Sequence, residues 1–155
     1  MKFQWKALAL NLAIPLGVGF LSFLLTPAIR DRYAQLYRPP FAPPGWVFPV
    51  VWTVLFILMG LASFLITVSG DPRRTEALKY YGLQLFFNLL WPVLFFRLGL
   101  FLPAFFWLLI LWFLVFIVVK KYWEIDELAG KLMFPYLLWL TFAAYLNLSI
   151  ALKAL

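Results

Sequence analysis

The chain has 155 residues but no cysteine and no histidine, and it is poor in charge. Without cysteine it has no disulfide, no thiolate nucleophile and no cysteine-ligated metal. Without histidine it lacks the commonest general base, the commonest metal ligand and the usual proximal haem ligand. Charged residues make up 12% of the chain, against roughly a quarter in soluble domains. We therefore expect no metal site, and a chain with too little polar surface to face water.

The chain is rich in apolar and aromatic side chains. Hydrophobic residues make up 66% and aromatic residues 21% of it, and the mean hydropathy is +0.96. Lipid is therefore the solvent for most of the protein. The formal net charge of +7 comes from Lys and Arg between apolar runs, where they match anionic head groups and set topology. Nucleic acid would need a soluble basic face, so we expect no nucleic-acid partner.

Five apolar runs follow one another, and the length of each falls within the range of about 17–25 residues that is usual for a helix crossing a hydrocarbon core. They cover about residues 5–26, 45–68, 77–96, 102–119 and 133–152. The pattern predicts an all-α membrane protein, a five-transmembrane-helix bundle that forms one domain over residues 1–155. The fourth run is apolar on all sides, so we expect it to face lipid. Residues 120–132 are predicted to form a charged loop.

Charge and small residues bear on topology and association. Eight Lys and Arg, Lys2 included, fall on the N-terminal side of the membrane and five on the other. The positive-inside rule then predicts a cytoplasmic N-terminus and an external first loop.

Ala9, Ala13 and Gly17 recur every four residues, a face that lets another helix approach closely. That face serves either packing within the monomer or dimerisation.

The first loop is stiffened by proline. Four prolines lie within residues 39–44 and predict a polyproline-like arm that carries Phe41. Such an arm, beside the tryptophans of the following helix, can close over a flat apolar ligand. The alternative is a tight surface turn with Trp46 as an ordinary interfacial anchor.

Aromatic and amide side chains share helical stripes on three of the predicted spans. Gln84 and Asn88 are expensive if they face lipid, so we expect them inside the bundle, as ligand contacts or as interhelical hydrogen bonds. No Asp or Glu lies within a predicted span and no Lys or Arg lies in the middle of one, which argues against a proton-coupled carrier. The stripes, at spacings of three and four residues, are Trp52, Phe56, Met59 and Ser63; Gln84, Asn88 and Trp91; and Tyr136, Trp139, Ala143, Leu146 and Asn147.

An aromatic-lined cavity with a few amides, covered by the proline-rich loop, suits a large, flat, mainly apolar ligand. The alternative is that these rings fill a lipid-embedded bundle.

Three segments resemble the signatures of a known family. They are the first loop Tyr33-Ala-Gln-Leu-Tyr-Arg-Pro-Pro-Phe-Ala-Pro-Pro-Gly-Trp46, the segment Gln84-Leu-Phe-Phe-Asn88-Leu-Leu-Trp91-Pro, and the segment Pro135-Tyr-Leu-Leu-Trp139-Leu-Thr-Phe-Ala143-Ala-Tyr-Leu-Asn147. In this order they resemble the tryptophan-rich sensory proteins, also called the TspO, translocator protein or peripheral-type benzodiazepine receptor family. The resemblance covers essentially the whole chain.

The resemblance implies a five-helix bundle that forms a homodimer and binds protoporphyrin and related tetrapyrroles. It also implies binding of isoquinoline carboxamide or benzodiazepine ligands, and a bacterial role in light-dependent protoporphyrin breakdown. With the stripes, it assigns ligand binding to Tyr33, Pro43, Pro44, Trp52, Phe56, Asn88, Trp91, Trp139, Ala143 and Leu146.

The sequence departs from the animal members after the fifth-helix signature. Leu148 stands where they carry the tyrosine of a proposed cholesterol motif. Seven residues separate Tyr145 from Lys153, outside the spacing of that motif. Sterol binding is therefore not expected, and a bacterial cell membrane is favoured.

The leading hypothesis is a membrane protein that binds free-base protoporphyrin as a ligand, not as a resident cofactor. One alternative is light-driven porphyrin oxidation, with Trp52 or Trp139 as the redox partner of the excited ligand. A second is passive transport of porphyrins or other lipophilic molecules across the bilayer.

Overall fold

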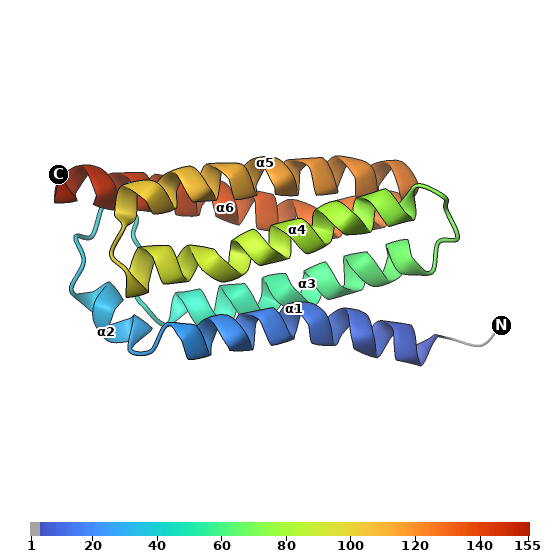
Figure 1. Cartoon of the computed structure of the whole chain (residues 1–155), viewed down its shortest axis with the longest axis horizontal. Coiled ribbons are helices and arrows are strands. Elements are labelled where there is room, and N and C mark those ends of the chain that lie inside the picture. The colour runs from blue at the N-terminus through green and yellow to red at the C-terminus, as the bar shows by residue number, and fades with distance from the viewer. Residues whose placement is uncertain (1–3) are drawn as a thin grey trace.

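The computed structural model describes residues 4–155, and within that range it is helical, with no strand. The helices lie side by side along one axis, and a short one crosses an end of the bundle (Figure 1). The all-α prediction is confirmed. In chain order the elements are α1 (Trp5–Leu25), α2 (Ile29–Ala34), α3 (Val47–Thr67), α4 (Arg74–Pro92), the π-helical turn η1 (Val93–Arg97), α5 (Phe101–Ile125) and α6 (Glu127–Ala154).

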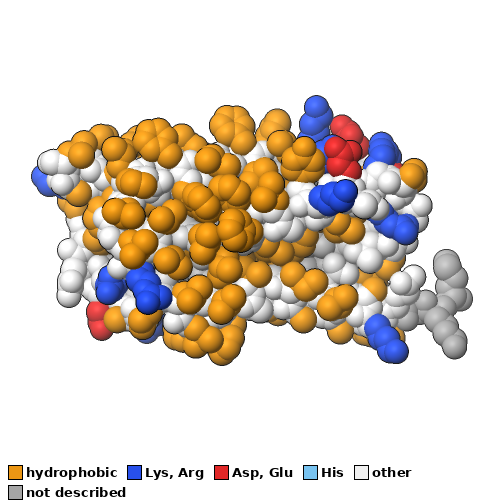
Figure 2. All heavy atoms as spheres, in the orientation of Figure 1, with side chains coloured by type: hydrophobic (Ala, Val, Ile, Leu, Met, Phe, Trp, Pro, Cys, Tyr) orange, Lys and Arg blue, Asp and Glu red, His pale blue; other side chains and the backbone are white. Residues whose placement is uncertain are grey.

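Four of the described helices are long and apolar enough to cross a membrane: α1, α3, α5 and α6. The first two match their predicted runs within two residues. The third run corresponds to α4 and η1, whose first turns carry Arg74, Glu76 and Lys79. Hydrophobic side chains cover the middle of the molecule, and charged ones gather toward its two ends (Figure 2). This distribution is that of a membrane protein.

The predicted charged loop at 120–132 is wrong. Helix α5 continues to Ile125, and α6 begins at Glu127, so only Asp126 separates them. The backbone of Asp126 is extended, and its carboxylate accepts hydrogen bonds from the N–H groups of Leu128 (2.9 Å) and Ala129 (3.4 Å). This N-cap satisfies donors that a new helix leaves unpaired, so charged composition did not require a loop here.

The expectation that the fourth run faces lipid fits only the exposed side of α5. Helix α5 packs against both α4 and α6 and buries seven residues, Leu108 and Val115 among them. Helix α1 is the exposed one, since only Asn11 and Pro15 are buried on it. A helix with apolar side chains all round can lie in either place, so composition alone does not decide which helix is central.

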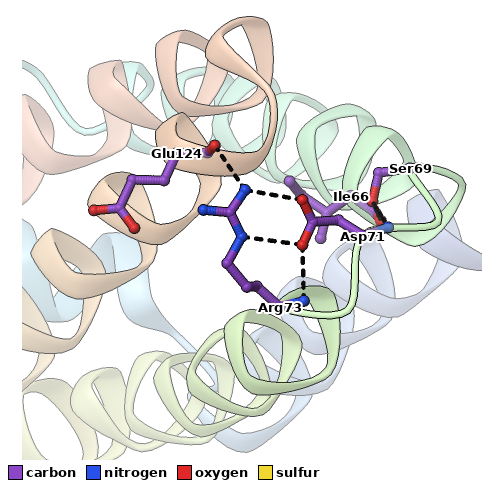
Figure 3. Close-up of polar contacts among 5 residues, drawn as sticks. All are labelled: Ile66, Ser69, Asp71, Arg73 and Glu124. Atoms are coloured by element: carbon purple, nitrogen blue, oxygen red, sulfur yellow. Dashed lines mark hydrogen bonds and ion pairs between the residues drawn. The ribbon is translucent and has the colours of Figure 1, made fainter.

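The loop between α3 and α4 is fastened to the end of α5 (Figure 3). The Arg73 guanidinium donates two hydrogen bonds to the Asp71 carboxylate, at 3.0 and 2.9 Å, and one to the carbonyl oxygen of Glu124 at 3.2 Å. The Arg73 hydrogen bonds lower the pKa of Asp71 to about 2. At this end of the bundle, three successive helices are therefore joined by one arginine.

Candidate functional site

A cavity of about 640 Å³ lies in the half of the bundle that α2 crosses. Its volume is within the usual range for small-molecule sites. Five helices contribute to its wall, so the cavity exists only in the folded bundle. The lining residues are Leu16, Gly19, Phe20, Ser22, Phe23, Thr26, Ile29, Arg30, Tyr33, Gly45, Phe48, Pro49, Trp52, Thr53, Phe56, Asn88, Trp91, Pro92, Phe96, Trp139 and Ala143.

Two indoles from different helices meet at this wall. The ring centroids of Trp52 on α3 and Trp139 on α6 are 6.5 Å apart, and the ring planes are nearly perpendicular at 89°. Phe56 lies one turn from Trp52, with its ring centroid 5.6 Å away. Phe48 meets Trp139 edge-on at 5.8 Å. Each of these rings lines the cavity.

A chain of hydrogen bonds lies behind the aromatic wall. Asn88 Nδ2 donates to the Tyr136 hydroxyl at 2.7 Å, and that hydroxyl donates to Gln84 Oε1 at 2.7 Å. Gln84 is fully buried and does not line the cavity, whereas Asn88 does. Gln84 therefore serves in a hydrogen bond between helices α4 and α6. Asn88 joins that network and keeps its amide oxygen as an acceptor.

Trp91 is held in place by its own polar edge. Its indole Nε1 donates to Asn147 Oδ1 at 3.0 Å, and Asn147 Nδ2 donates to the carbonyl oxygen of Phe101 at 2.8 Å. These bonds join α4, α6 and the start of α5. Trp91 therefore lines the cavity with a ring whose N–H group already has a hydrogen-bond acceptor.

The backbone changes from α to π geometry directly after Trp91. Pro92 has no N–H to donate, and the N–H of Leu98 bonds to the carbonyl of Val93 at 2.9 Å, a π-type spacing. Pro92 and Phe96 both line the cavity. Wide turns of this kind are common at functional sites because they alter which side chains share a face.

Helix α2 forms the roof of the cavity and is fixed at both ends. Ala28, which precedes it, has a left-handed conformation with φ of 61°, which turns the chain sharply after α1. Arg32 Nη1 donates to the carbonyl oxygens of Phe96 (2.6 Å) and Arg97 (3.1 Å). The roof is therefore joined to the end of η1 across the bundle.

Tyr33 connects α2 to the proline-rich segment. Its hydroxyl donates to the carbonyl oxygen of Pro43 at 2.5 Å, and its ring packs on Phe48 with centroids 4.8 Å apart. Burial raises the pKa of the Tyr33 hydroxyl, against a smaller opposite effect of the Arg38 charge. The hydroxyl therefore stays protonated, as its role as a donor requires.

The proline-rich segment is a folded turn and not an extended arm. The N–H of Ala42 bonds to the carbonyl of Pro39 at 3.1 Å, and Phe41 has a φ of 69°. Proline followed by a positive φ is the pattern of a type II turn. Phe41 is 89% exposed and does not line the cavity, so it does not close the site. Tyr33 and Phe48 take that place.

Most residues that the sequence assigned to ligand binding lie at one cavity, and three do not. Leu146 is buried but is absent from the wall, because it lies about two turns of α6 beyond Trp139. Pro43 and Pro44 lie outside the wall, although the Pro43 carbonyl holds Tyr33. The assigned residues that do line the cavity are Tyr33, Trp52, Phe56, Asn88, Trp91, Trp139 and Ala143.

The sequence did not indicate the part of the wall that α1 supplies and, apart from Tyr33, did not indicate the part that α2 supplies. Gly19 lies where a Cβ would come within 2.7 Å of the Phe56 ring, so glycine allows α1 to pack against the aromatic wall. Phe20 and Arg30 also line the cavity, and no sequence motif indicated that they would. Phe48 could have been found, because it lies four residues before Trp52 on the same stripe.

The cavity has few polar groups, and two of them lack partners. Trp139 Nε1 is buried and has no hydrogen-bond partner among residues 4–155. Arg30 is the one charged side chain on the wall as described. The described residues also contain no cluster of Asp, Glu, His or Cys that could hold a metal ion. The arrangement can hold a planar apolar molecule, with the Arg30 cation and the amide of Asn88 as polar groups on the wall.

Comparison with known proteins identifies the family of the chain. The model of the TspO/MBR family matches residues 11–152. The tryptophan-rich protein TspO of Chlorobaculum tepidum is 33% identical over 153 residues, 97% of each chain. The tryptophan-rich sensory protein of Cereibacter sphaeroides is 37% identical over 95% of this chain and 90% of its own. The translocator protein of Ovis aries is 36% identical over 81% of this chain and 78% of its own. With a family match over nearly its whole length, this chain belongs to the TspO/MBR family.

Proposed function

We propose that the protein binds tetrapyrroles such as protoporphyrin IX in the cavity lined by Trp52 and Trp139, and accepts isoquinoline carboxamide or benzodiazepine-type ligands there. The observation that supports this proposal is the perpendicular pair of indoles on an otherwise apolar wall. A cavity of about 640 Å³ suits a large ligand. Membership of the TspO/MBR family agrees with it.

The angle between the indoles limits how a flat ligand lies. With ring planes at 89°, a macrocycle that stacks on one indole meets the other with its edge. Trp139 Nε1 is buried without a partner, so the ring has to turn before this N–H can donate to a polar atom of the ligand. The ligand therefore does not stack on both tryptophans at once. Asn88 offers its free amide oxygen from the neighbouring helix.

The test is a titration with protoporphyrin IX, followed by quenching of tryptophan fluorescence and by the porphyrin absorption band. Replacing both Trp52 and Trp139 by Leu removes both aromatic contacts and should weaken binding roughly tenfold or more, since each such contact contributes about 0.5–1.5 kcal/mol. The matched control replaces Trp112 and Trp123, which do not line the cavity. Equal affinity in the wild type and both double variants would contradict the proposed site.

A second candidate function is light-dependent degradation of the bound porphyrin. The observation that favours it is that two indoles, the most oxidisable side chains present, line the same cavity. In the first step the photo-excited tetrapyrrole gains one electron and the indole of Trp52 or Trp139 becomes a radical cation. Oxidative opening of the macrocycle then requires an external oxidant, dioxygen, which accepts the electron from the reduced porphyrin. Bleaching of bound porphyrin under light should slow in the single Trp→Phe variants. Bleaching at the same rate per bound ligand would contradict this reaction.

We propose that five helical segments span a bacterial cell membrane. Four of them are α1, α3, α5 and α6, and the remaining one, third in chain order, is formed by α4 and η1. Together they run from Arg74 to Arg97, about 36 Å at 1.5 Å per residue, and the charged first turns of α4 lie at the membrane surface. The N-terminus is then cytoplasmic and the cavity opens toward the outer half. Lys2, which contributes to that charge balance, lies outside the described residues. Labelling of single engineered cysteines in intact cells tests the orientation.

A homodimer is also proposed. Ala9, Ala13 and Gly17 are exposed on α1, and a Cβ built on Gly17 meets nothing within 4 Å, so this face is not used for packing within the monomer. Because the chain has no cysteine, Ala13→Cys supplies a single thiol. It should give a disulfide-linked dimer in membranes, and Phe113→Cys on the exposed side of α5 should not. Equal cross-linking of the two would contradict this interface.

A further inference from the structure

Arg30 is a cation on the wall of an apolar cavity, and no described side chain neutralises it. It lies in the first turn of α2 and is exposed. None of the ion pairs, hydrogen bonds or ring contacts found among residues 4–155 involves its guanidinium. A guanidinium keeps its charge at all ordinary pH values, so it remains available to an anion.

The other basic residues at this end of the bundle are engaged. Arg32 donates to carbonyl oxygens at the end of η1, and Arg97 Nη1 donates to the carbonyl of Leu25 at 3.3 Å. Arg38 lies over the Tyr33 ring at 5.5 Å, and Lys153 lies over the Tyr37 ring at 5.5 Å. Arg30 therefore differs from its neighbours in two ways: it lacks a partner and it borders the cavity.

The backbone that carries Arg30 is held in place. Arg32 and Tyr33 join α2 to η1 and to the proline turn, as described above. Arg30 and Tyr33 are three residues apart, so they share one face of α2, and both line the cavity. The roof thus presents one flexible charged side chain from a fixed position.

We propose that Arg30 binds a carboxylate at the edge of the ligand, so that the site selects planar apolar acids over their neutral esters. This inference rests on the proposed tetrapyrrole function and adds a specificity-determining residue to it. A guanidinium meets a carboxylate through two parallel hydrogen bonds, a geometry that an ester cannot reproduce. The ligand then lies with its apolar body against the aromatic wall and its acid group beneath α2.

The experiment compares protoporphyrin IX with its dimethyl ester on the wild type, Arg30→Gln and Arg38→Gln. Arg30→Gln should weaken binding of the free acid roughly three- to tenfold, the range between an exposed ion pair and a charge-assisted hydrogen bond. Affinity for the ester should stay unchanged, which also shows that the variant is folded. Arg38→Gln removes the same charge at the same end of the protein. Its loss of contact with the Tyr33 ring should affect acid and ester equally, so the ratio of the two affinities should stay that of the wild type.

Three results would overturn the inference. An equal loss for acid and ester in Arg30→Gln would indicate a general effect on the roof. An equal effect of Arg30→Gln and Arg38→Gln on the ratio of the two affinities would indicate a diffuse positive field. No effect of either variant would show that the carboxylate is not bound there, while tetrapyrrole binding itself stands. If the wild type binds neither acid nor ester, the proposed function fails, and this inference with it.

Discussion

The indole rings of Trp52 and Trp139, 87 residues apart in the chain, lie with centroids 6.5 Å apart and planes at 89°. Tyr136, one turn before Trp139, meets Trp52 in the same edge-on manner at 6.1 Å. Two aromatic stripes on α3 and α6 thus meet at the wall of the cavity. A cavity shaped by two perpendicular rings favours a ligand with both a broad face and a defined edge.

Tyr136→Phe should destabilise the protein. The variant leaves Asn88 Nδ2 and Gln84 Oε1 without the hydroxyl that pairs them. Unpaired buried groups cost about 1–3 kcal/mol, toward the lower end within a membrane bundle. Thermal unfolding in detergent should show a lower midpoint than the wild type. Tyr80→Phe is the control, since the Tyr80 hydroxyl makes no hydrogen bond in the described part of the chain; an equal midpoint for all three proteins would count against the network.

Gly60→Ala should separate α1 from α3. A Cβ at position 60 comes within 2.7 Å of the backbone oxygen of Asn11 and 2.9 Å of Leu12 Cα, which cannot rotate away. Overpacking of this kind costs about 1–3 kcal/mol. At Gly82 a Cβ meets nothing within 4 Å, so Gly82→Ala should be neutral or slightly stabilising. The unfolding midpoint of Gly60→Ala should be lower than that of Gly82→Ala. The reverse order would mean that α1 and α3 are packed differently.

Tyr33→Phe should loosen the roof without removing the ring. It loses one hydrogen bond to the Pro43 carbonyl, worth roughly 0.5–1.5 kcal/mol, and so about two- to tenfold in ligand affinity if the roof closes the site. Hydrogen exchange of the N–H groups in residues 29–42 should become faster. Tyr37→Phe is the control, since Tyr37 lies under Lys153 and its hydroxyl makes no hydrogen bond among the described residues. Unchanged exchange in Tyr33→Phe would show that this bond does not hold the loop.

Asp71 should give a stability term that depends on acid pH. Its pKa is lowered to about 2 by the Arg73 hydrogen bonds, below the ordinary value of 3.8. A lowered folded-state pKa means that the contribution is complete above the ordinary value and disappears as the pH falls through about 2. Asp71→Asn should therefore slightly lower the unfolding midpoint at pH 6 and have no effect near pH 2. An equal effect at both pH values would show that the change in unfolding midpoint does not come from the ionisation of Asp71.

Helical periodicity predicted the centre of the site because it is a property of single helices. Trp52 and Phe56, and Trp139 and Ala143, lie four residues apart and do share faces of the cavity. Depth along a helix is not given by periodicity, which is why Leu146 falls on the right face but outside the wall. The amides were expected inside the bundle and are there, Asn88 at the cavity and Gln84 behind it.

Features that depend on neighbours could not be predicted from the sequence. The wall that α1 supplies depends on which helices pack together, and Gly19 has meaning only once Phe56 lies against it. The turn at Phe41 depends on hydrogen bonds from Tyr33 and from Tyr145, whose hydroxyl donates to the Pro40 carbonyl at 2.7 Å. Local proline geometry alone favoured an extended arm.

The measurement that tests the central claim most directly is a structure of the protein with protoporphyrin IX bound. The account predicts the macrocycle in the cavity, stacked on one of Trp52 and Trp139, edge-on to the other, and covered by Tyr33. A macrocycle bound on the outer surface of the helices, with both indoles free of it, would contradict the account.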